Sequence, residues 1–237
     1  MDMNRGVPLT LAAAGGLLEY LEQAIAEGNY DADDIAEARD NAVAFGTGEA
    51  IKMMLDVEKT TEKQNTQIIV DLLSLDRVDA LKEAWDALGG DLLCEDIHHI
   101  EKFIYAAARG GVTEYLTEFI ARAKKIKPGY KLSVEMCMSV CASDPDIAEI
   151  LLAETANISS GVIFAGKTTC DYVNPAVVKV LLDAGARSTE VSLCAVLQSV
   201  LPISGVTGAI ESLNMLVEAG ASPERAVAVL PWKGTTR

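Results

Sequence analysis

The segment VPLTLAAAGGLLEYLEQAIAEGN, residues 7–29, decides the fold that the sequence predicts. Pro8 and Leu9 open a short apolar stretch, and Gly16 follows at a turn whose left-handed conformation favours Gly. A second apolar stretch runs to Gly28, where a left-handed cap would end a helix. The segment therefore predicts two short helices joined by a tight turn. Because neither helix would be stable alone in water, each must pack against neighbours.

The second half of this segment recurs along the chain. Seven stretches begin a short apolar helix that often ends in Gly, and they start at Glu19, Glu49, Asp79, Glu114, Asp146, Ala176 and Glu211. Their starts are separated by 30, 30, 35, 32, 30 and 35 residues. A further helical stretch precedes each of the six later segments, over residues 35–44, 67–75, 100–108, 131–141, 161–170 and 191–200. A recurring period in this range is typical of stacked helical hairpins that share one continuous core.

Residues 7–29 resemble an ankyrin repeat over their whole length, and the resemblance extends unevenly over nearly the whole chain. Ala12 and Ala13 match the family's small pair, which lets adjacent first helices pack closely. Gly28 matches the family's helix-ending glycine. The family's TPLH histidine is absent from every repeat, and Thr10 occupies its position in the first one. We therefore expect irregular loops compared with a regular ankyrin array.

The resemblance implies an all-α fold, an ankyrin-type α-solenoid of about seven degenerate helix-turn-helix repeats in a single domain over residues 1–237. The expected repeats cover residues 5–31, 32–61, 62–92, 93–128, 129–158, 159–188 and 189–222. The low aromatic content of 5% independently favours closely packed helices over a β-sandwich. The alternative is another α-solenoid, but the bulky first-helix pattern of tetratricopeptide repeats is absent and HEAT repeats are longer.

The ends and three insertions depart from the repeat. Residues 223–232 predict a C-terminal capping helix with Ser222 as its N-cap and Trp232 over the open core, unless the chain is a piece of a longer protein. Residues 58–65 predict a solvated connection, and residues 201–208 a lengthened turn in the last repeat. The basic run at residues 124–131 is interpreted as a helix end followed by a Pro-Gly turn.

The net charge of −15 limits the partners. It disfavours nucleic acid and anionic membranes, and it favours a protein with a basic segment. The simpler interpretation is that the charge keeps an Ala-rich chain soluble. No apolar run is long enough to predict a membrane span. The odd number of cysteines in apolar stretches predicts buried thiols in a reducing compartment, the cytoplasm or the nucleus; they are Cys94, Cys137, Cys141, Cys170 and Cys194.

The sequence offers little for catalysis or metal binding. Cys94 and His98 are four residues apart, but a zinc site needs three or four ligands, and Asp96 is better interpreted as a helix N-cap. With two adjacent histidines and no phosphate-binding glycine motif, we expect no enzyme, no metal and no cofactor. The acid that opens most of the recurring helices is favoured by the helix dipole and is interpreted as structural.

The resemblance implies a protein-protein interaction module, which acts within a larger protein and binds a protein or peptide on its concave face. The alternatives are a stand-alone effector or inhibitor of a cellular or host protein, and an enzyme on a helical scaffold. Carried over by position, the candidate face comprises Asp33, Asp34, Arg39, Asp40, Gln64, Gln67, Glu95, His98, Lys102, Tyr130, Lys131 and Glu135. Acids outnumber bases on its first half, which predicts a partner segment of positive charge. The sequence leaves the oligomeric state open.

Overall fold

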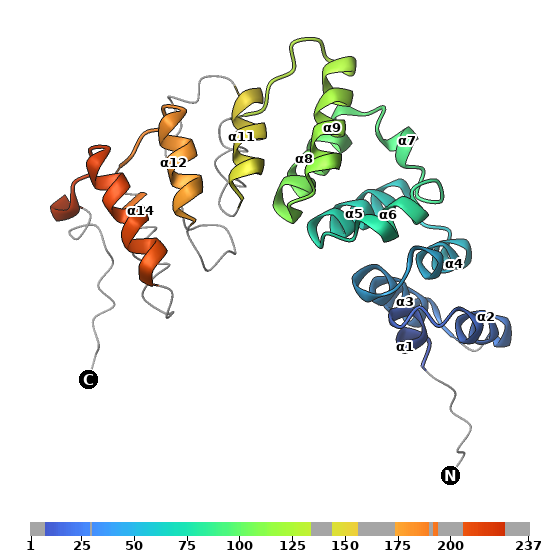
Figure 1. Ribbon diagram of the computed structural model, residues 1–237. Coiled ribbons are helices and arrows are strands. Elements are labelled where there is room, and N and C mark those ends of the chain that lie inside the picture. Colours follow the sequence, from blue (N-terminus) through green and yellow to red (C-terminus); the bar gives the residue numbers. More distant parts are fainter. Residues whose placement is uncertain are drawn as a thin grey trace, which may run out of the picture. The chain divides into compact units, whose positions relative to one another are not determined.

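The computed structural model describes residues 8–28, 30–133, 144–155, 174–189, 192–193 and 206–225. These residues are mostly helical and contain no β-strand, although Leu132 and Thr155 form an isolated parallel bridge. The all-α class is thus confirmed for this part of the chain. The chain divides into two compact units, Met1–Pro128 and Gly129–Arg237, here called unit 1 and unit 2 (Figure 1). Each is described by itself.

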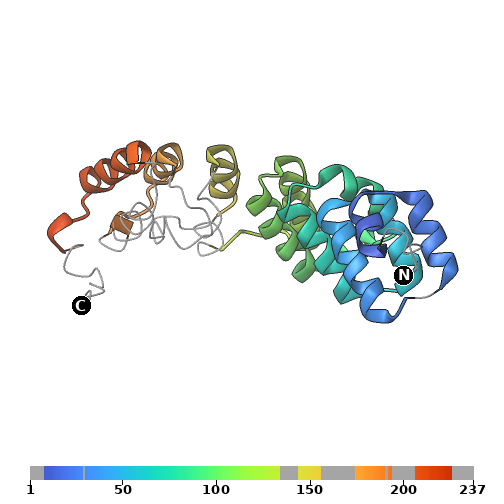
Figure 2. The ribbon, with the colours of Figure 1, turned by 90° about the horizontal axis from the view of Figure 1, so that it is seen from below.

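Unit 1 is built from helical hairpins. Its described helices are α1 (Leu9–Ala14), α2 (Leu18–Glu27), α3 (Ala32–Phe45), α4 (Gly48–Glu58), α5 (Glu62–Ser74), α6 (Val78–Ala84), α7 (Gly90–Leu93), α8 (Ile97–Gly110) and α9 (Thr113–Ile126). The hairpins are α1–α2, α3–α4, α5–α6 and α8–α9, and they follow one another through unit 1 (Figure 2). The first helices α1, α3, α5 and α8 contact one another in sequence, as do the second helices α2, α4 and α6. The short helix α7 was not predicted.

The turns inside three hairpins share one backbone geometry. Gly16, Asp76 and Gly111 have positive φ angles of 62°, 53° and 77°. The next residue donates its N–H to the carbonyl five residues earlier, as a Schellman helix end requires. These bonds are Leu17 to Ala12 at 2.9 Å, Arg77 to Leu72 at 2.8 Å and Val112 to Ala107 at 2.9 Å. The predicted left-handed turn at Gly16 is confirmed.

Small residues bring the first helices close together. Ala12 and Ala13 are fully buried, and Ala107 and Ala108 are at most 1% exposed. A Cβ at Gly110 would overlap the carbonyl oxygen of Leu73, so α8 and α5 meet backbone to backbone. The first helices of the hairpins therefore touch where their side chains are smallest.

Acidic residues lie in the first turns of five of the second helices. Glu19, Glu49, Asp79, Glu114 and Asp146 lie in the first turns of their helices, as predicted. The prediction for Glu211 is wrong, because α14 (Val206–Glu218) begins five residues earlier. The lengthened turn predicted at residues 201–208 is wrong for residues 206–208, which are helical. The solvated connection predicted at residues 58–65 is shorter than expected, because Glu58 ends α4 and α5 begins at Glu62.

Unit 2 repeats the capping chemistry of unit 1. Helix α11 (Pro145–Glu154) contacts α12 (Pro175–Asp183), which in turn contacts α14. Asp144 and Asn174 are the N-caps of α11 and α12, and each is followed by a proline. At the first position of a helix, the N–H that proline lacks would make no helical hydrogen bond. The Ser222 hydroxyl accepts a hydrogen bond from the Arg225 N–H at 3.4 Å, in agreement with the predicted N-cap.

Several predictions fall outside the described residues. They concern the helix at 161–170, most of those at 131–141 and 191–200, the cap residue Trp232, and Cys137, Cys141, Cys170 and Cys194. Residues 131–133 are described and are not helical. Cys94 is described, and it is a free, buried thiol.

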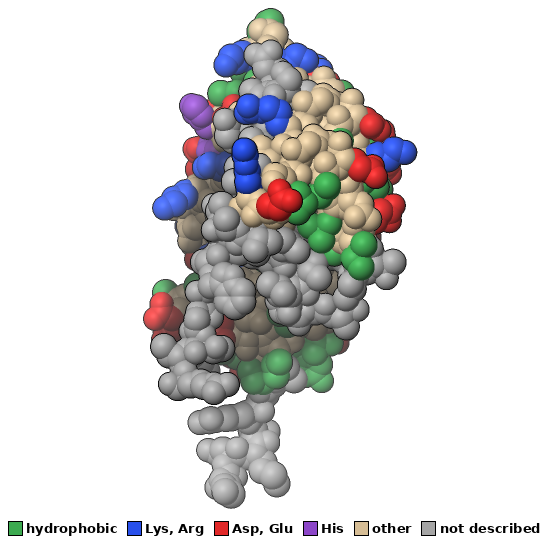
Figure 3. All heavy atoms as spheres, turned by 90° about the vertical axis from the view of Figure 1, so that its left-hand side faces the viewer, with side chains coloured by type: hydrophobic (Ala, Val, Ile, Leu, Met, Phe, Trp, Pro, Cys, Tyr) green, Lys and Arg blue, Asp and Glu red, His purple; other side chains and the backbone are tan. Residues whose placement is uncertain are grey.

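The boundary between the two units falls in the basic run at residues 124–131. Lys124 and Lys125 lie in the last turn of α9, and Gly129 has a positive φ of 81°. The predicted helix end and Pro-Gly turn are confirmed. Figure 3 shows Lys and Arg side chains spread over the upper half of the face that it displays.

Candidate binding groove between α3 and α5

Helices α3 and α5 both begin with a capping box. The Asp31 carboxylate accepts hydrogen bonds from the N–H groups of Asp33 and Asp34, both at 2.9 Å, and Asp34 accepts one from the Asp31 N–H at 3.3 Å. Thr61 and Gln64 form the equivalent reciprocal pair at the start of α5. Each capping box satisfies backbone donors that the helix leaves unpaired. Asp34 and Gln64, predicted as partner contacts, therefore also have structural roles.

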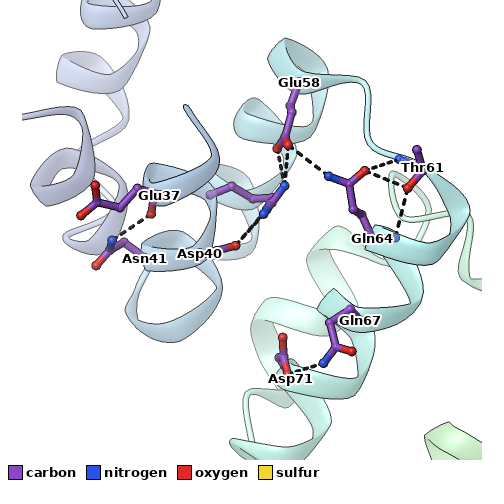
Figure 4. A network of polar contacts seen from close by, with 9 residues as sticks. Glu37, Asp40, Asn41, Glu58, Thr61, Gln64, Gln67 and Asp71 are labelled. Atoms are coloured by element: carbon purple, nitrogen blue, oxygen red, sulfur yellow. Dashed lines mark hydrogen bonds and ion pairs between the residues drawn. The ribbon is translucent and has the colours of Figure 1, made fainter. Parts of the chain in front are cut away.

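A polar network ties α3 to α4 and α5. The Arg39 Nη1 donates to the Glu58 carboxylate at 2.6 Å, and its Nε and Nη2 donate to Asp40 Oδ1 at 3.0 and 2.8 Å. Gln64 Nε2 donates to the same Glu58 at 3.2 Å, which extends the network to α5 (Figure 4). The Arg39 side chain is only 11% exposed. We therefore assign Arg39 to holding the helices together rather than to contacting a partner.

The spacing within the first-helix row is uneven. Helix α3 contacts α1 extensively and α8 contacts α5 extensively, whereas α3 and α5 make few contacts. A groove of about 380 Å³ occupies the space between α3 and α5. Its polar lining is Arg39, Asp40, Gln64, Gln67 and Asp71, and its apolar lining is Val43, Ala44, Ile68 and Leu75.

The groove unites four residues of the predicted face, Arg39, Asp40, Gln64 and Gln67. Sequence reasoning missed Asp71 and the apolar lining. The signal for Asp71 was present, because residues 64, 67, 71 and 75 follow the three- and four-residue spacing of one helix face.

Two carboxylates give the groove its charge. Asp40 is 69% exposed, whereas Asp71 is half-buried and accepts a hydrogen bond from Gln67 Nε2 at 2.9 Å. Burial raises the pKa of Asp71 above its ordinary value, and the negative charge of Asp40 raises it further, although the Gln67 hydrogen bond opposes both. The charge of Asp40, which is itself paired with Arg39, thus acts on Asp71 through space and disfavours its ionised form.

The other predicted face residues of unit 1 lie apart from this groove. Asp33 is exposed in the first turn of α3. Glu95 lines a second hollow of about 450 Å³ with Glu62, Asn65 and His99. His98 and Lys102 are exposed on α8.

In unit 2, Tyr130 is only 5% exposed, which makes it a core residue rather than a contact residue. Lys131 Nζ lies 3.7 Å from Glu154 Oε2. Glu135 is outside the described residues. The three residues predicted at this end of the face therefore give no described surface comparable to the groove.

The cysteine and histidine considered for metal binding are not on one helix face. Cys94 follows α7 and is buried, while His98 lies in α8 after the N-cap Asp96, whose carboxylate accepts from the His98 N–H at 2.8 Å. Burial raises the pKa of the Cys94 thiol to about 11. No group of three or more potential metal ligands occurs among the described residues.

The chain matches no protein-family model, no curated protein and no solved structure. Within the described residues, no helix combines the length and apolarity that crossing a bilayer requires. A functional assignment must therefore come from the groove and its surroundings.

Proposed function

We propose that the protein is an ankyrin-type helical-repeat module that binds an extended, basic segment of a partner protein along the first helices of unit 1. The observation that carries this proposal is the groove between α3 and α5, in which Asp40, Gln67 and Asp71 meet an apolar lining. Concave sites with a few convergent polar groups are the usual places for ligands.

The repeated hairpin geometry supports the ankyrin part of the proposal. The left-handed turns at Gly16, Asp76 and Gly111 occur at equivalent places in three of the four hairpins described in unit 1, and buried small pairs lie in α1 and α8. Such hairpins stack into arrays whose first helices and loops form a binding surface.

The distribution of charge supports a basic partner. Residues 1–128 contain 24 acidic and 13 basic residues, a net charge of −11 out of the −15 of the whole chain. A potential of this sign attracts cationic segments and accelerates their association. The charge is concentrated in the unit that contains the groove.

The test is selection from a randomised dodecapeptide library against the full-length chain. We expect the selected peptides to be basic, and we expect the charge-reversal variant Asp33→Lys/Asp40→Lys/Asp71→Lys to retain them at least about tenfold more weakly. The matched control is Glu22→Lys/Asp56→Lys/Asp86→Lys, which makes the same charge change at exposed positions on or directly after the second helices.

The control should weaken retention by less than about threefold, since charges outside the site act only through screened, long-range attraction. Neutral or acidic selected peptides would contradict the proposal. So would equal losses in the two variants, because these would indicate attraction to net charge alone. Salt-dependent retention by wild type is expected in either case.

A further inference from the structure

The second and third hairpins each expose a large apolar side chain at the end of the first helix. Phe45, the last residue of α3, is 71% exposed, and Leu75, the C-cap of α5, is 53% exposed. Counted from the start of the second helix, the equivalent residues of the first and fourth hairpins are Gly15 and Gly110. The exposed apolar side chains at this position therefore belong to two neighbouring hairpins, and we call Phe45 and Leu75 the turn patch.

Arg77 joins the two turns that carry the turn patch. Its Nη1 donates to the Val43 carbonyl at 3.0 Å, and its Nη2 donates to the Gly46 carbonyl. Gly46 directly follows Phe45, and Arg77 lies two residues after Leu75. Because one arginine side chain reaches from one turn to the other, the ends of α3 and α5 lie next to each other.

The surface beside the turn patch is acidic. A hollow of about 510 Å³ is lined by residues of both turns, among them Gly46 and Asp76, which directly follow Phe45 and Leu75. Its charged lining consists of three acids and one base, namely Asp76, Asp79, Glu83 and Arg77. An apolar patch beside a lining of net negative charge is complementary to an apolar side chain that is flanked by cations.

The chain itself contains a segment of this kind. Helix α9 ends at Ile126, whose side chain is 43% exposed, and the neighbouring Lys125 and Lys127 are exposed as well. With Lys124 they form the sequence KKIK, residues 124–127, here called the KKIK segment. Its apolar side chain and its positive charges match the apolar side chains and the negative charges at the turn patch.

The KKIK segment cannot reach the turn patch of its own chain. A Cβ at Gly110 would overlap the Leu73 carbonyl, so the turn ends of the third and fourth hairpins lie at the same level. From that turn, α9 runs back along α8 for 14 residues, about 20 Å, before it ends at Ile126. The segment and the patch therefore lie at opposite ends of the hairpins, and a contact between them requires a second copy of the chain.

We propose that the protein associates with itself head to tail. Ile126 of one copy packs between Phe45 and Leu75 of the next, and Lys125 and Lys127 lie against the acidic lining beside the turn patch. Because the two surfaces differ, the contact is heterologous and leaves one patch and one segment for further copies. The contact is small, so we expect a Kd on the order of 100 μM. This inference goes beyond the proposed function, since it involves no other protein.

Sedimentation equilibrium of the full-length chain measures the association. The weight-average mass of wild type should rise with concentration above the chain mass of 25.2 kDa, and it should rise less at high salt, which screens the attraction. The variant Phe45→Ser/Leu75→Ser lacks the turn patch, and Lys125→Glu/Ile126→Ser/Lys127→Glu lacks the KKIK segment. Each should associate at least about tenfold more weakly than wild type.

Mixing the two variants is the decisive measurement. Each variant retains the surface that the other lacks, so an equimolar mixture should form a complex of one chain of each with about the wild-type Kd. This complex should not grow further, because its remaining surfaces are the two altered ones. Circular dichroism of each variant alone reports whether it is folded.

Two control variants make the same kinds of change elsewhere on the surface. Leu11→Ser/Leu92→Ser removes two apolar side chains that are 60% and 74% exposed. Lys63→Glu/Lys102→Glu/Ile210→Ser matches the charge and size changes in the KKIK segment, again at exposed positions. Both should associate within about threefold of wild type, because distant surface charges act only through screened attraction.

Three results would overturn the inference. They are a wild-type chain that stays monomeric up to about 1 mM, association that survives in either variant, and a mixture of the two folded variants that stays monomeric. Pairing of one turn patch with another would appear as association of the variant that lacks the KKIK segment. Selection of basic peptides tests the proposed function separately, because it does not depend on whether the copies associate.

Discussion

At the scale of single residues, Arg39 shows how a predicted contact can have a structural task. It is a long cation on the expected binding face, yet its guanidinium joins α3 to the end of α4 through Glu58. Both side chains are largely buried, at 11% and 19% exposure. Removing one partner of such a pair leaves the other charge poorly solvated.

We therefore expect Arg39→Met to lower the free energy of unfolding by about 2 kcal/mol. Urea denaturation of the full-length chain measures this loss. The double variant Arg39→Met/Glu58→Gln should recover part of it, because no charge is then left without its partner. A double variant as unstable as the sum of the two single ones would show that the pair is not coupled.

Asp71 gives a prediction about pH. Its pKa in the folded protein is raised by burial and by Asp40, so the folded state favours the protonated acid. Folded-state stability is thus lost as pH rises from the unfolded pKa, about 4, through the higher folded pKa. Asp71→Asn should stabilise the protein more at pH 7 than at pH 3. Urea denaturation of wild type and variant at both pH values measures the difference, and an equal effect at the two would contradict it.

At the scale of elements, the first helices are in close contact in one place and separated in another. Gly110 lets α8 approach the backbone of α5, while the space between α3 and α5 remains as a groove. The network of Arg39, Glu58 and Gln64 spans this looser junction with hydrogen bonds. The groove is therefore a consequence of how the helices are spaced.

Two adjacent glycines at the end of α8 separate the contributions of packing and backbone conformation where α8 meets α5. Gly111→Ala should cost about 1 kcal/mol, because its φ of 77° disfavours a side chain although a Cβ would meet open space. Gly110→Ala should cost about 3 kcal/mol, because its Cβ would overlap the Leu73 carbonyl. Thermal and urea denaturation rank the two. The reverse order would mean that α8 can move away from α5 at little cost.

At the scale of the whole molecule, unit 1 has the features of a domain that folds by itself. Its aromatic core brings Phe119 within 5.4 Å of Phe103, 5.6 Å of Tyr115 and 6.2 Å of Trp85, measured between ring centroids. All of these residues precede Pro128, where unit 1 ends.

We expect a chain of residues 1–128 to fold and to unfold cooperatively in urea, because a compact unit with its own core loses little when a neighbouring unit is removed. Trp85 is the single tryptophan of this segment, so its fluorescence and near-ultraviolet circular dichroism report on the aromatic core. A broad transition, or a near-ultraviolet signal that disappears, would mean that unit 1 depends on unit 2.

The sequence by itself determined the helical hairpins of unit 1, and it did so through local chemistry. Gly16 and Gly28 at left-handed positions, Asp96 as an N-cap and the acids of the first turns could each be predicted, because a turn or cap depends on residues close in sequence. Where the local signal was weaker, as at Glu211, the predicted helix start was wrong by several residues.

Only the tertiary structure decided which polar residues share a site. The sequence placed Asp40 and Gln67 on one face, but it could not show that α3 and α5 stand apart or that Asp71 lines the same groove as Asp40. Nor could it show that Arg39 is bound to Glu58 or that Tyr130 is buried. The spacing of two helices depends on side chains from several hairpins at once, so the groove exists only after the hairpins have packed.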